Sequence, residues 1–485
     1  MTPATASKNA LGTKAPLCVD LDGTLLRTDL LWESLFALIG HRPEEIFAVL
    51  GWLLKGRAYL KKQLAERVTL DIDTLPWNVP FLAWLKDQRA RGRRLILVTA
   101  ADEILARQAA DHLGIFDEVF ASDGTVNLKG GKKAALLNKE FGEAFDYAGN
   151  SPADWAIWRS CRQIVAVDTP WWITSRLVKS GRLAESFQTP KHRIAVWRRA
   201  LRVQQWIKNV LIFLPVIAAH KALDRERLIA TLICFVAFSL VASATYLGND
   251  LADLASDRMH PRKKFRPIAA GDLSIPAALA GSLTLLAGGL ALATRAGGII
   301  APLLILLYGL SSFIYSISLK KIALLDVYVL SGLYTLRIVV GGEAGRVPLT
   351  GWFLSFSVFL FLSLGFAKRA AELHRVIVAH LHPQVPGRGY DTDDYLPVMC
   401  FGIASAFAAA LVLTLYFQSV AVQALYRSPQ LLWAIFPFFL YWLTRVWLLA
   451  ARGVMQEDPI NFAIRDRVTW LIVAICGIIL KLASL

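Results

Sequence analysis

Nine apolar runs in the C-terminal part of the chain constrain its fold more than any other feature. Each run is roughly 20 residues long, which is about the length of helix that crosses a bilayer. Their limits are 204–220, 228–248, 273–293, 298–318, 323–342, 350–367, 397–419, 429–450 and 467–484. The first and sixth runs are short or partly polar. The sequence therefore predicts an all-α transmembrane bundle of nine helices over residues 203–485.

The composition separates this bundle from a soluble N-terminal part. Apolar residues make up 55% of the 485 residues and charged residues only 19%, as in membrane proteins. The long apolar runs come after residue 190, and the residues before it have the composition of a soluble domain. Residues 1–16 contain no apolar signal core, so we expect this domain to stay in the cytoplasm.

The net charge of +16 narrows the choice of partners. An excess of Lys and Arg suits cytoplasmic loops next to anionic lipid and substrates that carry phosphate groups. The soluble part has no basic module with interleaved aromatic residues, so nucleic acid is not an expected partner. The five cysteines lie far apart without a CxxC pair, so the sequence indicates neither a zinc site nor a disulfide framework.

The distribution of positive charge predicts the orientation in the membrane. If the N-terminus lies in the cytoplasm, the segments after the second, fourth, sixth and eighth runs are also cytoplasmic. These segments hold more Lys and Arg than the segments on the other side, as the positive-inside rule requires. We therefore expect a multi-pass protein of the cytoplasmic (inner) membrane, in contact with membrane lipid.

A charged stretch, 249–267, follows the second apolar run. On a helix with about 100° per residue, Asp250, Asp253 and Asp257 fall within about a quarter of the circumference. Clustered carboxylates repel one another, and a bound Mg²⁺ relieves this repulsion while it carries phosphate oxygens on its other side. Five cations that could hold phosphate charge follow, namely Arg258, Arg262, Lys263, Lys264 and Arg266. The stretch predicts a seat for a diphosphate; the alternative, a solvated loop, explains the cations but not the acidic face.

The pattern Asn-Asp-x-x-Asp-x-x-x-Asp at 249–257 resembles the first acidic motif of the UbiA superfamily of intramembrane prenyltransferases. Its continuation, Asp-Arg-x-His-Pro-x-Lys-x-x-Arg-Pro at 257–267, resembles the decaprenyl-phosphate phosphoribosyltransferase branch of that family. The resemblance covers residues 195–485. It implies Mg²⁺ ligands at Asn249, Asp250, Asp253 and Asp257, and substrate contacts at Arg258, His260, Lys263 and Arg266.

The soluble part begins with a short apolar strand that ends in two acids and a glycine, Leu-Cys-Val-Asp-Leu-Asp-Gly-Thr at 17–24. This resembles motif I of the haloacid dehalogenase (HAD) phosphatases. In a strand, residues two apart face the same way, so Asp20 and Asp22 are placed together. The resemblance implies that Asp20 attacks phosphorus as the nucleophile, and that Asp22 protonates the leaving oxygen and later activates water.

Three further patterns follow in the order that HAD phosphatases show. Thr99 ends a second buried strand and would bind the transferred phosphoryl group, and Lys133, with Lys132 beside it, supplies the motif III cation. The fourth pattern has Gly-Asn-x-x-x-Asp where the family usually has Gly-Asp-x-x-x-Asp, so Asn150 brings less charge to the metal. The implied Mg²⁺ ligands are Asp20, Asp22, Asn150 and Asp154.

These resemblances divide the chain into three parts. We expect an α/β HAD-like Rossmannoid domain over residues 1–170, with a small helical cap at about 28–91. Residues 171–202 mix tryptophans with Arg and Lys, which favours an interfacial linker. The UbiA-type domain takes up 203–485. A HAD domain that has lost activity and acts as a regulator remains the alternative.

Charged residues inside the apolar runs point to a chamber. Asp326 and Arg337 lie on one predicted helix, about 16 Å apart by helical rise and nearly in line. Charges within a span are costly and usually face a functional cavity. Tyr315 and Lys320 end the fourth run, where contact with phosphate and simple anchoring at the interface are equally compatible with the sequence.

The sixth run ends in Lys368, Arg369 and, three residues later, Glu372. Many UbiA enzymes carry a second aspartate-rich motif here; this chain has cations that suit a sugar phosphate. A polar loop with Tyr390 and Asp391 follows and is expected to close over the site, although its acids could equally cap the next helix.

Together the two motif sets imply a bifunctional enzyme. The membrane part would transfer 5-phosphoribose from phosphoribosyl pyrophosphate to polyprenyl phosphate with Mg²⁺, and the HAD part would remove the 5-phosphate. The alternative is a prenyltransferase that acts on a prenyl diphosphate and an aromatic acceptor, with an unrelated or regulatory HAD domain. The sequence leaves the oligomeric state open, a homo-oligomer included.

Overall fold

The structure is a computed structural model that describes residues 15–190, 192–378, 385, 387–455 and 459–485. Residues 1–14, which include most of the segment without a signal core, lie outside the described residues. The chain forms two compact units. Unit 1 comprises Met1–Leu201 and Asp250–Ala280 as far as they are described, and unit 2 comprises Arg202–Asn249 and Gly281–Leu485.

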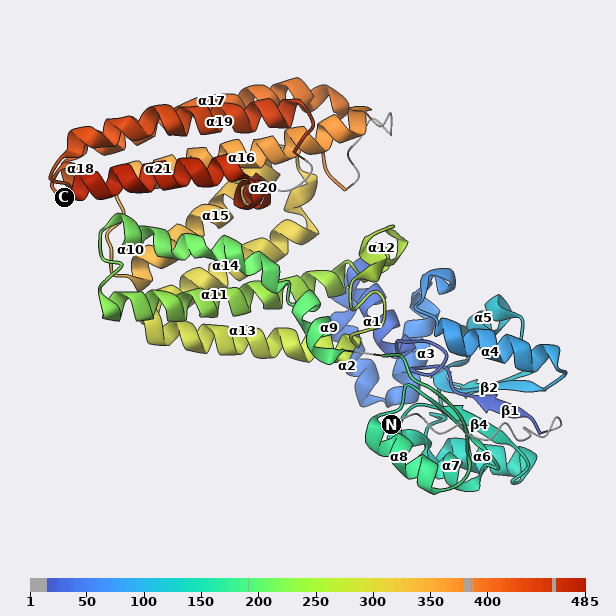
Figure 1. Cartoon of the computed structure of the whole chain (residues 1–485). Helices are drawn as coiled ribbons and strands as arrows, with labels where there is room; N and C mark the ends of the chain where they lie inside the picture. Colours follow the sequence, from blue (N-terminus) through green and yellow to red (C-terminus); the bar gives the residue numbers. More distant parts are fainter. Residues whose placement is uncertain (1–14, 191, 379–384, 386, 456–458) are drawn as a thin grey trace, which may run out of the picture. The chain divides into compact units, whose positions relative to one another are not determined.

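Unit 1 is built on a six-stranded parallel sheet with the strand order β3-β2-β1-β4-β5-β6 (Figure 1). The strands are β1 (Leu17–Val19), β2 (Leu95–Asp102), β3 (Glu118–Ser122), β4 (Asp146–Gly149), β5 (Ile164–Val167) and β6 (Leu183–Phe187). The residues of β1, β4 and β5 are all buried, as in parallel sheets covered on both faces.

Alternate strand residues point to opposite faces, and each face has its own hydrophobic core. Leu17 and Val19 pack on one side with α4 (Val79–Ala90) and α5 (Glu103–Leu113), and Cys18 packs on the other side. That second side is covered by α6 (Gly131–Phe141), α7 (Trp155–Ser160) and α8 (Trp171–Lys179). The result is a three-layer α/β/α unit, as predicted for the N-terminal part.

The predicted cap region contains helices, but they do not form one body. Helices α1 (Leu30–His41), α2 (Ile46–Leu54) and α3 (Arg57–Arg67) share a small core around Leu38, Val49 and Leu60. Helix α4, in contrast, packs on the sheet through Phe81 and Leu85. A cap over the whole of 28–91 is therefore not confirmed, and only the part before α4 has a core of its own.

Most of the expected interfacial linker, 171–202, belongs to the sheet unit in the structure. It supplies α8 and the edge strand β6, which pairs with β5, and then α9 (Arg193–Ala200). Ile173 and Leu177 of α8 are buried in the sheet core, whereas Trp171 is 80% exposed. The tryptophans suggested an interfacial segment, but the apolar face of α8 lies on the sheet.

Unit 1 also includes the charged stretch and the residues after it. This segment contains α12 (Leu254–Met259), the short 3₁₀ helix η5 (Lys263–Phe265) and the first residues of α13 (Ile275–Gly297). Gly271, at a φ of +71°, lies so close to Arg27 that a Cβ would stand 2.7 Å from the Arg27 carbonyl oxygen. A glycine is required there for both the backbone conformation and the close contact.

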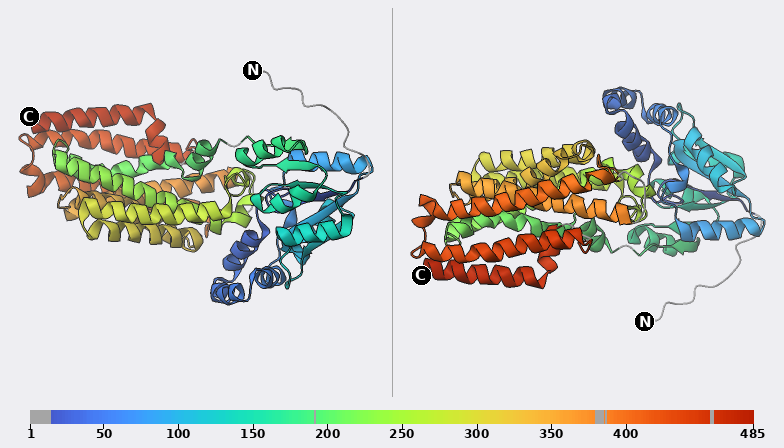
Figure 2. Two further views of the ribbon diagram at one scale, coloured as in Figure 1. Left: turned by 90° about the horizontal axis from the view of Figure 1, so that it is seen from below. Right: turned by 90° about the horizontal axis from the view of Figure 1, so that it is seen from above.

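Unit 2 is helical, and its long helices run side by side (Figures 1 and 2). In the described residues, eight helices are long and apolar enough to cross a membrane: Arg225–Ala252, Ile275–Gly297, Ile300–Ile317, Leu325–Ala344, Gly351–Val378, Thr392–Gln418, Pro429–Ala451 and Arg467–Ser484. They correspond to α11, α13, α14, α15, α16, α17 with η7 (Thr392–Asp394), α19 (Ile435–Ala451) with η8 (Pro429–Ala434), and α21. Helix α17 itself spans Tyr395–Gln418.

The predicted count of nine spanning helices is not confirmed. The first apolar run forms the 3₁₀ helix η4 (Val203–Phe213) and the short α10 (Leu214–Ala218), because polar residues interrupt the run and Pro215 begins a new helix. The remaining short elements of this unit are η6 (Leu319–Lys321), α18 (Val420–Gln423) and α20 (Pro459–Arg465).

Two large hydrophobic cores hold most helices of unit 2 together, and a smaller one around Leu432 adds α21. One joins η4, α11, α14 and α15 through residues such as Ile212, Phe238 and Ile305. The other joins α15, α16, α17 and α19, where Trp447 of α19 lies against Gly402 of α17. Many outward-facing residues of these helices are apolar, as expected for surfaces that face lipid.

We predict that Asp146 is essential for the stability of unit 1. This buried carboxylate accepts hydrogen bonds from Arg93, Arg162 and the backbone N–H of Gln163. Asp146→Ala leaves the buried Arg93 guanidinium without its counterion, which should lower the free energy of unfolding by about 3–5 kcal/mol. Denaturant unfolding followed by tryptophan fluorescence checks this.

The matched control is Asp87→Ala, which removes an exposed ion pair with Arg91 on α4. That change should alter the free energy of unfolding by less than about 1 kcal/mol. Equal effects of the two substitutions would contradict the prediction.

Candidate active sites

The first candidate site lies where β1 ends. The Asp20 carboxylate accepts a hydrogen bond from Lys133 Nζ at 2.8 Å, and Asp22 accepts one from the Leu30 backbone N–H at 3.0 Å. Gly23 has a φ of +74°, and a Cβ on it would stand 2.1 Å from Asn150 Nδ2. The chain turns directly after Asp22 and passes close to the fourth-motif loop. Only a glycine at position 23 has both the backbone conformation and the space that this turn requires.

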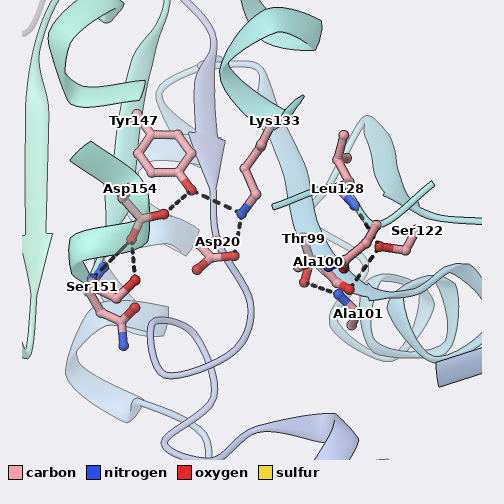
Figure 3. Close-up of polar contacts among 12 residues, drawn as sticks. Asp20, Thr99, Ala100, Ala101, Ser122, Leu128, Lys133, Tyr147, Ser151 and Asp154 are labelled. Atoms are coloured by element: carbon pink, nitrogen blue, oxygen red, sulfur yellow. Dashed lines mark hydrogen bonds and ion pairs between the residues drawn. The ribbon is translucent and has the colours of Figure 1, made fainter. Parts of the chain in front are cut away.

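Lys133 joins the first and fourth motifs (Figure 3). It comes from the first turn of α6 and is buried, and its ammonium also donates to the Tyr147 hydroxyl at 3.1 Å. That hydroxyl in turn donates to Asp154 at 2.9 Å. The neighbouring Lys132 is exposed, so the structure places the preferred motif III lysine beside Asp20.

The two motif residues of the fourth pattern, Asn150 and Asp154, have different contacts. The Asp154 carboxylate also accepts hydrogen bonds from the backbone N–H groups of Asn150 and Ser151, at 3.1 and 3.0 Å. Asp154 therefore holds the loop and orients Tyr147, and both Asp154 and Asn150 line the cavity beside Asp20. That Asp154 contacts a metal remains a prediction.

Thr99 is buried within β2, three residues before the strand ends at Asp102, and its hydroxyl accepts a hydrogen bond from the Ala101 backbone N–H at 3.0 Å (Figure 3). The nearby cation that lines the cavity is Lys61 of α3, which donates to the Ala100 carbonyl and to Asn127. Burial lowers the pKa of Lys61 from its ordinary value.

A cavity of about 340 Å³ is lined by the polar residues Asp20, Asp22, Lys61, Lys133, Asn150 and Asp154, whereas Thr99 and Tyr147 are not among its lining residues. Burial raises the pKa of Asp20 to about 6, although Lys133 opposes the shift, and it raises the pKa of Asp22 well above its ordinary value. Carboxylate and amide oxygens are the ligands that Mg²⁺ prefers, and Asp20, Asp22 and Asn150 bring them to this one cavity. The donor set therefore fits a magnesium ion.

One wall of the cavity comes from a distant part of the chain. Ser274, Ile275 and Pro276, which begin α13, line it together with Trp32 of α1. Nearby, the Arg258 guanidinium binds the Glu33 carboxylate through two bonds of 2.8 and 2.6 Å, and both side chains are less than 10% exposed. Glu33 also accepts a hydrogen bond from the Thr28 hydroxyl.

The acids of the charged stretch converge, but not on one continuous helix. Helix α11 ends at Ala252, Asp253 stands at the N-cap position of α12, and α12 carries Asp257. Arg266 nevertheless binds both Asp250 and Asp257, at 3.0 and 2.6 Å. The prediction of a straight acidic helix is thus corrected, because the chain breaks at Asp253, while two of the three acids do meet.

The expected phosphate contacts of this stretch have other partners in the structure. Arg258 is occupied by Glu33 and by the Ala269 carbonyl. His260 Nδ1 accepts from the backbone N–H groups of the following turn, and Lys263 Nζ stands 3.9 Å from Asp257. Burial raises the pKa of Asp257 even with Arg266 beside it.

In unit 2, a polar cluster joins three helices and the loop before α17. Asp326 at the start of α15 pairs with Arg369 of α16 at 2.8 Å and accepts a hydrogen bond from the Tyr390 hydroxyl at 2.6 Å. Arg369 also pairs with Glu372. Tyr390, in the loop that was expected to close over the site, therefore contacts Asp326 at the start of α15, and closure over a bound substrate remains a prediction.

Arg388 completes this cluster and is absent from the predicted site residues. It donates to the Tyr315 hydroxyl at 2.9 Å and lies 3.6 Å from Asp326 and 3.9 Å from Glu372. Lys320 and Lys368 are half-buried. Asp391 begins η7 in a capping box with Asp394, which is the alternative that the sequence left open.

Arg337 belongs to a separate cluster. It donates to Asn209 at 2.9 Å and to the Tyr308 hydroxyl at 3.0 Å, and its guanidinium lies over the rings of Phe238, Tyr308 and Tyr334. Asp326 and Arg337 are both buried, as expected of charges within a span, but their described contacts are different.

Four residues with evident structural roles were absent from the predicted sites: Glu33, Lys61, Tyr147 and Arg388. Tyr147 directly precedes the fourth motif and Arg388 stands in the predicted loop, so their positions gave some signal. Glu33 and Lys61 lie in helices whose partners are far away in sequence, and no local pattern marks them.

Comparisons with known proteins cover both sites. The UbiA prenyltransferase family model matches residues 210–472, and the haloacid dehalogenase-like hydrolase model matches residues 17–156. The uncharacterized protein y4nM of Sinorhizobium fredii is 38% identical over 464 residues, which is 95% of this chain and 90% of that protein. Nodulation protein NoeC of Azorhizobium caulinodans is 34% identical over 289 residues, 59% of this chain and 92% of that protein.

Decaprenyl-phosphate phosphoribosyltransferase of Mycobacterium tuberculosis is 38% identical over 194 residues, which is 39% of this chain and 63% of that protein. The match lies in the part of the chain that the UbiA model covers. The two family matches agree with the sequence motifs on which they were predicted.

We predict that Lys133→Met lowers the hydrolysis of phosphate esters by about 10²- to 10³-fold, because a preorganised cation beside the nucleophile is lost. Phosphate release from ribose 5-phosphate by the full-length chain measures the effect. Lys132→Met, which changes the exposed neighbour, is the control and should retain near-normal activity. Similar losses in both variants would show that Lys133 has no special role.

We predict that Arg258→Gln destabilises unit 1 by about 3–5 kcal/mol, because it leaves the Glu33 carboxylate buried without a counterion. The double variant Glu33→Gln with Arg258→Gln should be more stable than Arg258→Gln alone, since no buried charge remains. Denaturant unfolding of the four proteins gives the coupling energy. Additive effects would rule out a direct energetic link between the two side chains.

Proposed function

We propose a two-step function for this chain, which belongs to the UbiA prenyltransferase family and carries a HAD-like hydrolase domain. The membrane part transfers 5-phosphoribose from phosphoribosyl pyrophosphate to a polyprenyl phosphate. The HAD part then hydrolyses the 5-phosphate and leaves polyprenyl-phosphoryl ribose. The observation that carries the proposal is that the HAD motif residues around one cavity, and the transferase acids Asp250 and Asp257 that share Arg266, belong to one compact unit.

The donor is inferred from the charged stretch. Its sequence resembles the phosphoribosyltransferase branch, and the relative that shares 38% identity with the UbiA part is named for that activity. Cationic residues at the end of α16 and in the following loop, Lys368 and Arg388, supply positive charge for a sugar phosphate. A prenyl group moving to an aromatic acceptor would not need these cations.

The acids of the charged stretch fit a divalent cation. One oxygen of the buried Asp257 carboxylate accepts no hydrogen bond from the residues that the structure describes, and the other shares the Arg266 guanidinium with Asp250. Asp250, Asp257 and, from the sequence motif, Asn249 and Asp253 would hold Mg²⁺. Such an ion neutralises the charge of a pyrophosphate leaving group. The polyprenyl phosphate oxygen then attacks the anomeric carbon, and the bond to pyrophosphate breaks.

The HAD site performs the second step with its own side chains. Asp20 attacks the phosphorus of the 5-phosphate, and the bond between phosphorus and the ribose oxygen breaks as Asp22 gives that oxygen a proton. The raised pKa of Asp22, caused by burial, suits a group that must first be protonated. Lys133 stabilises negative charge on the phosphoryl oxygens. Water, deprotonated by Asp22, then releases phosphate from Asp20.

The start of α13 supports a substrate that is bound to the membrane. Ser274, Ile275 and Pro276 line the phosphatase cavity, and Ile275–Gly297 is apolar and long enough to span a bilayer. A cavity with this wall suits a phosphate ester that is attached to a lipid. We place the chain in the cytoplasmic membrane with the HAD domain in the cytoplasm, on the basis of its positive loops.

We predict that Asp20→Asn accumulates the phosphorylated lipid. The full-length variant, incubated with phosphoribosyl pyrophosphate, decaprenyl phosphate and Mg²⁺, should produce decaprenyl-phosphoryl ribose 5-phosphate, whereas the wild type produces the dephosphorylated lipid. Mass spectrometry of the extracted lipid distinguishes the two. A variant that makes the same final lipid as the wild type would disprove the sequential scheme.

The matched control is Asp250→Asn, which should make neither lipid because it lacks an acid of the transferase motif. Supplying a prenyl diphosphate with an aromatic acceptor tests the other activity of the family. Prenylation of that acceptor, without any ribosylated lipid, would favour the prenyltransferase function instead.

A further inference from the structure

A second cavity adjoins the phosphatase cavity in unit 1. It has a volume of about 420 Å³, and the two cavities share four residues, Gly23, Arg27, Asn150 and Ser274. The proposed function uses the first cavity for the 5-phosphate and assigns nothing to the second. A substrate that extends past the shared residues must enter this second space.

Both positively and negatively charged side chains line the second cavity. Arg27 and Arg193 line it, and so do Asp168 and Asp272. Asp272 is bound by Arg27 at 2.8 Å and, from α9, by Arg199 at 3.0 Å. Two guanidinium groups and two carboxylates thus line the cavity, and Asp272 is paired with Arg27 and, outside the lining, with Arg199.

The carboxylates already have donors, and some cationic donors do not. Asp168 accepts hydrogen bonds from the Thr189 backbone N–H at 2.7 Å and from its hydroxyl at 3.1 Å. The Arg27 Nε–H is buried and has no hydrogen-bond partner among the described residues. Arg193 forms no ion pair with any residue that the structure describes, and it lies at the exposed start of α9. These donors suit an anionic group that approaches along the cavity.

Part of the remaining wall is apolar. Val196 and Trp197 of α9 stand with Leu273 and Ala277 around the same space. A lining guanidinium that forms no ion pair with the described residues, that of Arg193, suits the negative charge of a phosphodiester. An apolar wall beside it matches a hydrocarbon chain.

We propose that the second cavity binds the phosphodiester that joins ribose to the lipid, together with the first carbons of the lipid chain. The inference rests on the proposed function, and it makes Arg193 a specificity residue that contacts a diester oxygen. The phosphatase site therefore prefers a lipid-linked ribose 5-phosphate to free ribose 5-phosphate.

Calorimetry on the full-length Asp20→Asn variant tests this binding without turnover. The two probes are ribose 5-phosphate and ribose 5-phosphate with a citronellyl phosphodiester at C1. We expect the diester to bind at least about tenfold more tightly, as a charge-assisted hydrogen bond and an apolar contact are added. Adding Arg193→Gln should remove most of this advantage and leave the affinity for ribose 5-phosphate unchanged.

The matched control is Arg198→Gln, which changes an exposed arginine of α9 that does not line the cavity. It should keep the full preference for the diester. Equal affinities for the two probes, or equal behaviour of the Arg193 and Arg198 variants, would overturn the proposal.

A second measurement separates this proposal from the proposed function. If the wild-type chain hydrolyses neither probe while the Arg193-dependent preference persists in binding, the phosphatase assignment fails and the diester site stands. If both probes are hydrolysed with the same KM in the wild type and in Arg193→Gln, the diester site fails and the phosphatase assignment stands.

Discussion

The ion pair between Glu33 and Arg258 connects two parts of the chain that are 225 residues apart in sequence. A buried charge is tolerated only when its partner is present, and here both members are almost fully buried. Arg258 directly follows the acid Asp257, and Glu33 lies one turn after the α1 start, where the Leu30 N–H binds Asp22. The segment that carries the transferase motif is therefore part of the buried interior of unit 1. The loop that holds Asp22 depends on this interior.

Two further contacts connect the same parts of the chain. Asp272 binds Arg27 and Arg199, and Gly271 allows the backbone to lie against Arg27. An isolated HAD domain would lose the partners of Glu33 and Arg27 and one wall of its cavity. The residues that follow the charged stretch therefore complete the wall of the cavity that holds the HAD motifs.

Many of the site residues were predicted from local sequence patterns. The elements and residues that were missed have physical reasons. The common orientation of Asp20 and Asp22 follows from the strand period, whereas Thr99 and Lys133 were predicted from the resemblance to the HAD motifs, and the structure brings Asp20 and Lys133 together. Strand β6 was missed because it is a short edge strand with exposed residues, preceded by a tryptophan-rich helix. The helix break at Asp253 and the shortened first apolar segment depend on tertiary packing and on Pro215. The partners Glu33 and Arg388 could not be assigned because no local pattern links them to their distant ion-pair partners.

Both candidate sites share one electrostatic condition. At the end of β1, burial raises the pKa of Asp20 even though Lys133 lies 2.8 Å away, and in the charged stretch burial raises the pKa of Asp257 even though Arg266 binds it. In each case one protein cation does not fully offset the desolvation of the carboxylates. A site in this state gains stability from additional positive charge near its acids. A cation bound beside these acids would offset part of the desolvation, which agrees with the Mg²⁺ proposed for each site.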